Sequence, residues 1–103
     1  MDTQKTAINI ARSFIQDCKA IGITFDKVLL FGSYARDTAH ENSDIDLLLI
    51  SQNFSDDLLD NLRSYAKVNI KYPIVETHPY SLKEFNESDE FIANIKREGI
   101  EIK

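Results

Sequence analysis

Two acidic residues separated by one apolar residue, Asp44 and Asp46, are side chains that could hold metal ions. They lie at the start of the apolar run 45–50, whose residue types suit a buried strand. Because successive side chains of a strand point to opposite faces, both carboxylates share one face, about 7 Å apart along the backbone at roughly 3.3 Å per residue. Two Mg2+ ions held roughly 3.5–4 Å apart by carboxylates recur in phosphoryl transfer, since they stabilise both the attacking and the leaving oxygen. The spacing therefore predicts metal-assisted chemistry on a phosphate.

The same two aspartates have a purely structural interpretation, as the solvated start of a strand. Against it, Leu48 and Ile50 follow on the same face, and unpaired charge beside apolar side chains is costly. Short motifs also match by chance, so the residues alone leave both interpretations open.

A candidate phosphate-binding turn precedes the aspartates, with ten residues between Ser33 and Asp44. Gly32 follows the apolar run 28–31 and lets the backbone approach a phosphate closely. The first N–H groups of a helical turn at 33–36 would point at an anion, and the Ser33 hydroxyl could donate to it. As a plain helix cap, Ser33 needs no function.

Arg36 can supply a forked, permanently charged contact to a phosphate. The alternative is a surface ion pair with Asp37 or Glu41, which would have little energetic weight.

Together, segments 32–36 and 43–47 resemble the signature of the polymerase-β-like nucleotidyltransferases, most closely their minimal single-domain members. Segments 76–80 and 99–102 also look like small bacterial members of that family, so the resemblance covers most of the chain. It implies an α/β (α+β) fold, with a small mixed β-sheet of three or more strands flanked by helices, as in the polymerase-β palm. Residues 1–103 would form one such domain.

The resemblance also implies a set of site residues. In the family a third carboxylate on a neighbouring strand completes the metal site, and the matching residue here is Glu76. One departure stands out, because Asp37 occupies a position where the family usually has glycine. The expected catalytic and metal-binding residues are Asp44, Asp46 and Glu76, and the expected nucleotide-binding residues are Gly32, Ser33, Arg36 and Ser43.

The activity implied by the resemblance is transfer of a nucleoside monophosphate, AMP from ATP, to a hydroxyl, with two Mg2+ ions as cofactors. Small members of the family are often antitoxins that modify an all-helical, ribonuclease-like (HEPN-type) toxin, so such a toxin is the expected partner. So short a chain also lacks an acceptor platform of its own, and a partner would supply it.

Two rival functions remain at this stage. The first is an inactive relative that neutralises a partner by contact, for which Asp37 is a hint and the intact Asp44, Asp46 and Glu76 are a counterargument. The second is a nucleotidyltransferase acting on a small molecule, which would need further residues or a dimer cleft.

Composition limits the classes of function. At 103 residues with 43% hydrophobic content, the chain suits one folded domain, and no apolar run approaches the ~20 residues of a membrane span. The net charge of −5 argues against sequence-independent binding of bulk nucleic acid. Without an export signal at its start, the chain is expected in the cytoplasm, and a homodimer stays open. Cys18 is alone, which excludes an internal disulfide, and a buried position is expected for it.

The pattern of apolar residues predicts the elements that position the site. A helix over 3–21 ends at Gly22, and strands are expected over 27–32 and 44–51, with a turn over 33–38 between them. The direction of one strand relative to the other stays open. The next helix opens at 55–57 and is expected to bury Leu58, Leu59, Leu62, Tyr65 and Ala66.

Pro73 restricts the following strand to an edge or a first position, with Glu76 near the strand's end and next to Asp46. Helices over 81–86 and 89–98 complete the chain, the second with Phe91, Ile92 and Ile95 inward. His40 is expected in an exposed loop. His78 lies on the strand face of Glu76, where it could contact substrate, or in a turn before Pro79.

Overall fold

A four-stranded mixed sheet, in the order β3-β2-β1-β4, is the centre of the fold. The computed structural model describes residues 3–40 and 42–103. Strand β1 (Lys27–Phe31) pairs antiparallel with β2 (Ile45–Ile50), and β2 pairs parallel with β3 (Val75–Tyr80). The short β4 (Ile100–Glu101), which the sequence pattern did not predict, pairs antiparallel with β1. The expected mixed sheet flanked by helices is confirmed.

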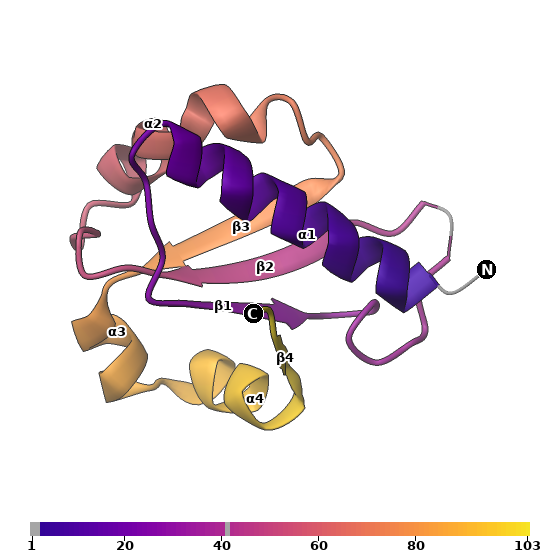
Figure 1. Ribbon diagram of the computed structural model, residues 1–103. Helices are drawn as coiled ribbons and strands as arrows, with labels where there is room; N and C mark the ends of the chain where they lie inside the picture. The colour runs from indigo at the N-terminus through magenta and orange to yellow at the C-terminus, as the bar shows by residue number, and fades with distance from the viewer. Residues whose placement is uncertain (1–2, 41) are drawn as a thin grey trace.

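Helices cover both faces of this sheet (Figure 1). The long α1 (Thr3–Ala20) and α2 (Leu58–Asn69) pack on one face, and the short α3 (Leu82–Glu87) and α4 (Glu90–Glu98) pack on the other. None of these helices, within the residues described, is both long enough and apolar enough to cross a lipid bilayer.

Strand β2 is buried on both faces because it lies inside the sheet. Ile45, Leu47 and Leu49 point toward α1 and α2, where they join the larger core. Leu48 and Ile50 point the other way and pack with Ile95 of α4 in a second, smaller core. Asp46 lies on this second face, since it alternates with Ile45 and Leu47.

The apolar face of α1 is confirmed for its central positions, since Ala7, Ala11, Phe14 and Cys18 are buried. Burial raises the pKa of the Cys18 thiol to about 12, which makes the thiol unreactive. Ile21, expected on the same face, is 48% exposed because α1 ends at Ala20.

The predicted buried face of α2 is partly wrong. Leu58, Leu59 and Ala66 are exposed, whereas Tyr65 is buried as expected. The helix is rotated because Asn61 turns inward, where its side-chain amide donates to the carbonyl of Ser55 at 2.8 Å and accepts from the Ser55 N–H at 3.0 Å. These two bonds satisfy a polar side chain that the periodicity placed outside.

Strand β3 is an edge strand, as a proline-containing strand should be. Pro73 precedes it and Pro79 lies within it, so Glu76 is near its start rather than near its end as expected. The first turn of α4 also differs from expectation, because Phe91 is 41% exposed while Ile92 and Ile95 are buried. Phe91 lies over the sheet end that carries Asp46, where it contacts Phe31 and His78.

Candidate active site

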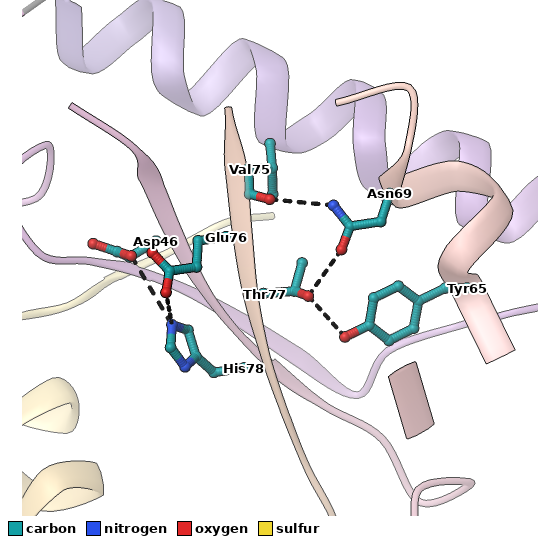
Figure 2. A network of polar contacts seen from close by, with 7 residues as sticks. All are labelled: Asp46, Tyr65, Asn69, Val75, Glu76, Thr77 and His78. Carbon is teal, nitrogen blue, oxygen red and sulfur yellow. Dashed lines mark hydrogen bonds and ion pairs between the residues drawn. The ribbon is translucent and has the colours of Figure 1, made fainter. Parts of the chain in front are cut away.

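Strands β2 and β3 bring two of the three predicted carboxylates together. Their parallel register places Asp46 opposite Glu76, and Leu48 opposite His78. Since side chains two residues apart share a face, Glu76 and His78 both project toward the face that carries Asp46. Figure 2 shows the three side chains converging on one side of β3.

The oxygen and nitrogen atoms of this cluster are within reach of one cation. One ligand atom from each of Asp46, Glu76 and His78 lies within 4.8 Å of the others. The Nε2 atom of His78 is 3.9 Å from Asp46 Oδ1 and 3.8 Å from Glu76 Oε1. The side chains of Asp46 and His78 are 24% and 30% exposed, and that of Glu76 is 55% exposed, so the cluster is open on the Glu76 side.

The charge of Asp46 is poorly stabilised by the protein alone. Burial first, and then the negative charge of Glu76 and Asp44, raise the pKa of Asp46 from its ordinary 3.8 to about 6, while Arg36 acts in the opposite direction. Burial also lowers the pKa of His78, against an opposing effect of Glu76. Carboxylates that lie this close together resist ionisation. A bound cation would offset the repulsion between their negative charges.

Gly32 follows β1 directly and touches Asp46. Its φ of +76° is in the left-handed region, and a Cβ atom added to it would lie 2.3 Å from Asp46 Oδ2. Glycine is therefore required at this position for two reasons. Its backbone conformation is unfavourable for other residues, and the Asp46 carboxylate occupies the space that a side chain would need.

The predicted turn after Gly32 is present over residues 33–37. The first amide to bond back is that of Arg36, which donates to the Gly32 carbonyl at 3.1 Å, and the Thr38 amide closes the turn on the Ser33 carbonyl at 2.9 Å. Within the described part of the chain, no backbone carbonyl accepts from the amides of residues 33–35. Three N–H groups at the start of the turn are thus available to an anion.

Asp37, where the resemblance expects glycine, adopts a φ of +58°. Aspartate is one of the few residues other than glycine that tolerate this region. The Asp37 amide donates to the Tyr34 carbonyl at 3.3 Å, which completes the C-terminal end of the turn. An aspartate in place of the usual glycine therefore preserves the turn geometry.

Three further predicted site residues do not belong to the group of converging ligand atoms: Asp44, Arg36 and Ser43. Asp44 precedes β2 and is exposed, and both it and Arg36 are close enough to change the pKa of Asp46. Arg36 makes no ion pair within residues 3–40 and 42–103, and its alternative partner Glu41 lies outside them. The Ser43 hydroxyl accepts from the His40 amide at 3.0 Å, so in this structure it stabilises the exposed loop before β2.

A cleft of about 310 Å3 opens beside the turn, between it and α4. It is large enough for part of a nucleotide, and it brings α4 into the site, which the sequence motifs did not predict. The residues that line it include aromatic, amide and charged side chains: Phe31, Gly32, Arg36, Phe91, Asn94 and Glu98.

A partly buried polar network on the opposite face of β3 fixes the strand that carries Glu76 and His78 (Figure 2). The Thr77 hydroxyl accepts from Tyr65 Oη at 2.9 Å and donates to Asn69 Oδ1 at 3.0 Å. The Asn69 amide donates in turn to the Val75 carbonyl at 3.2 Å. Every side-chain group in this chain of bonds has a partner, so α2 and β3 are joined at a defined register.

We expect Tyr65→Phe to lower the free energy of unfolding by about 1 kcal/mol, because it removes one buried hydrogen bond and keeps the ring. The matched control is Tyr72→Phe, which removes a hydroxyl from an exposed bond to Asp17 and should cost less than about 0.5 kcal/mol. Urea denaturation of both variants measures the difference. Equal costs would show that the network does not stabilise the α2–β3 contact.

Comparison with known proteins places this geometry in a family. Residues 11–102 match the family model described as a nucleotidyltransferase domain. A protein from Methanocaldococcus jannaschii with the name "Putative protein adenylyltransferase" is 38% identical over 95 residues, which cover 81% of this chain and 64% of the relative. The chain therefore spans slightly less than two thirds of that relative's length.

A solved structure has the same fold. The crystal structure of a "putative nucleotidyltransferase" from Sulfolobus solfataricus superposes with a TM-score of 0.69, at 17% identity, over 95% of this chain and 80% of that one. At this identity the likeness concerns the fold, and the match of residues 11–102 carries the family assignment.

Proposed function

Because the chain belongs to the nucleotidyltransferase domain family, we propose that it transfers a nucleoside monophosphate, AMP from ATP, to a hydroxyl group, with pyrophosphate as the leaving group. The observation that carries the proposal is the contact of a left-handed glycine turn with the Asp46 carboxylate at a sheet end where Glu76 converges. This contact puts anion-binding amides next to the cluster of carboxylates.

The residues present fit a divalent metal ion. The raised pKa of Asp46 and the convergence of Asp46 and Glu76 are features of a site that lacks a compensating positive charge. Asp46 and Glu76 would hold the metal with Asp44, which is exposed and close enough for its charge to raise the pKa of Asp46. Bound Mg2+ would neutralise phosphate charge and polarise the phosphoryl oxygens.

The chain's own groups have separate roles in the proposed reaction. The free amides of the turn and the Ser33 hydroxyl would bind the triphosphate, and Arg36 would neutralise part of its charge. The acceptor oxygen forms a new bond to the α-phosphorus while the bond from that phosphorus to pyrophosphate breaks. Glu76, the most exposed member of the cluster, would take the proton that the acceptor hydroxyl loses. The Ser43 hydroxyl accepts from the His40 amide, so its own hydrogen could be donated to the nucleotide without loss of that bond.

We further propose a protein as the acceptor. The M. jannaschii relative has the name "Putative protein adenylyltransferase", which supports a protein acceptor. The partner that best fits the family resemblance is a HEPN-type toxin, for which this chain would act as antitoxin. A protein partner would supply both the surface and the hydroxyl.

The test uses the purified chain, Mg2+, ATP labelled at the α-phosphate, and the product of the neighbouring gene as acceptor. We expect covalent label on the partner, with a mass gain of one AMP that requires the metal, and little transfer when the partner is omitted. The label should be lost in the Asp44→Asn/Asp46→Asn double variant, which keeps the side-chain shapes. A partner that binds tightly but stays unmodified would contradict transfer and support inhibition by contact.

A further inference from the structure

His78 is positioned by aromatic contacts with its ring nitrogen toward the carboxylates. Its imidazole packs edge-on against Phe31, with ring centroids 5.2 Å apart, and is tilted against Phe91 at 6.1 Å. These contacts come from β1 and α4, and the Phe31 and Phe91 rings also contact each other, with centroids 5.7 Å apart, so the three rings form one cluster. The contacts hold Nε2 at 3.9 Å from Asp46 Oδ1 and 3.8 Å from Glu76 Oε1. Figure 2 marks both distances with dashed lines.

The separations suit coordination by one ion. A metal about 2.1 Å from each of two ligand atoms joins atoms about 3.4 Å apart at a tetrahedral angle and at most about 4.2 Å apart. The distances from Nε2 to Asp46 Oδ1 and to Glu76 Oε1, 3.9 and 3.8 Å, lie between these values, so small side-chain rotations would bring the atoms to bonding distance from one ion. Both distances are also too long for hydrogen bonds, so direct bonds to the carboxylates do not explain the position of the ring.

The composition of the cluster differs from an all-oxygen site. The three groups whose ligand atoms already converge are two carboxylates and one imidazole, whereas Asp44 lies outside this group. Carboxylate and water ligands suit Mg2+, while an imidazole nitrogen favours transition metals such as Zn2+ and Fe2+. A nitrogen in the first coordination sphere therefore changes which ion the site selects.

We propose that His78 is a metal ligand through Nε2, together with Asp46 and Glu76, and that this nitrogen makes the site prefer a divalent transition metal over Mg2+. The inference rests on the proposed metal-assisted function and adds to it the choice of the ion. The neighbouring rings of Phe31 and Phe91 limit rotation of the imidazole, so the nitrogen is preorganised for coordination.

The experiment uses Zn2+ as the probe, because it is diamagnetic, and the full chain labelled with 15N. The sequence contains two histidines, so two sets of imidazole resonances are expected in long-range 1H–15N spectra. Zn2+ should shift the Nε2 resonance of His78 and leave His40, in its exposed loop, unchanged. Mg2+ at saturating concentration should leave both histidines unchanged.

Calorimetry on matched variants gives the second measurement. His78→Phe keeps an aromatic ring against Phe31 and Phe91, and His78→Gln keeps a polar group, so at least one variant should fold. Both should lose about tenfold or more of the Zn2+ affinity relative to Mg2+, since even groups outside the first coordination sphere change metal affinity by 10–100-fold. His40→Gln, the control, should keep the wild-type ratio.

Zn2+ binding that leaves the His78 nitrogen resonance unchanged would overturn the assignment, as would an unchanged Zn2+ to Mg2+ ratio in the folded His78 variants or a wild-type chain that binds no Zn2+. Both measurements are made without nucleotide or acceptor. Failure of nucleotide transfer therefore leaves them intact, and failure of His78 coordination leaves Mg2+-dependent transfer intact.

Discussion

Asp46→Asn is expected to slow nucleotide transfer by orders of magnitude while making the metal-free protein more stable at neutral pH. The substitution keeps the shape of the side chain and removes a carboxylate from the cluster with Glu76 and His78. A bound metal stabilises the transition state by several kcal/mol, so loss of a ligand should reduce the rate by roughly 10²–10⁴-fold. Single-turnover label transfer to the partner measures this loss.

The stability gain follows from the raised pKa of Asp46. In the folded chain it is about 6, against an ordinary 3.8, so between these values the native state binds more protons than the unfolded state. The free energy of unfolding of the wild-type chain therefore falls as pH rises from about 4 to about 6. A pKa difference of about 2, at 1.36 kcal/mol per pKa unit, lowers the free energy of unfolding by at most about 3 kcal/mol.

An asparagine at position 46 is neutral at every pH, so the free energy of unfolding of the variant does not fall between pH 4 and pH 6. With a chelator present, its stability should equal that of the wild type near pH 4 and exceed it above pH 6, as thermal unfolding at several pH values would show. Added Mg2+ or Zn2+ should stabilise the wild type only. Asp44→Asn is the matched control, because the exposed Asp44 should affect transfer with little change in metal-free stability. A variant with the wild-type pH profile would show that Asp46 is ionised without cost.

The parts of the site that lie on regular strands could be predicted from the sequence. Alternation along 44–50 placed Asp46 on a shared face, and the proline near the third strand indicated its edge position. Gly32 was recognised from its place after an apolar run, since few residues can follow a strand into a tight turn. Such features depend on local backbone geometry, which the residue types largely determine.

The elements that the sequence did not predict depend on tertiary contacts. For α2, apolar residues recur at helical spacing on two overlapping faces, and the choice between them depends on the Asn61 bonds to Ser55, which lies outside the helix. Strand β4 has only two residues and acquires its structure by pairing with β1. Local propensity carries little information for either case.

His78 shows the same limit within the site. Its alternation with Glu76 was visible in the sequence, but Pro79 made a turn equally consistent with the residues. The structure decides, because β3 is an edge strand that accommodates Pro79, and Phe91 of α4 contacts the imidazole. A Glu-x-His pattern on an edge strand, beside a strand whose second residue is an aspartate, is the signal that would have indicated a third ligand.

Gly32→Ala is expected to disrupt both the fold and the metal site. The new methyl group would lie 2.3 Å from Asp46 Oδ2, far inside van der Waals contact, and the backbone φ of +76° is unfavourable for alanine. Either Asp46 rotates away from the cluster or the turn shifts, and both changes separate the free amides from the carboxylates. We expect metal affinity to fall at least about tenfold and transfer to become undetectable.

Gly22→Ala is the matched control, because it has the backbone strain of an alanine at positive φ without the clash with Asp46. Gly22 also has a positive φ, +88°, but a Cβ atom there would meet nothing within 4 Å. Gly22→Ala should lower the free energy of unfolding by about 1 kcal/mol, because alanine is unfavourable at this φ, and metal affinity should be unchanged. The excess destabilisation of Gly32→Ala over Gly22→Ala, measured by urea denaturation with a chelator present, then reports the contact with Asp46. Equal destabilisation, with metal affinity retained in both variants, would show that Asp46 can leave Gly32 freely and that the glycine serves the turn alone.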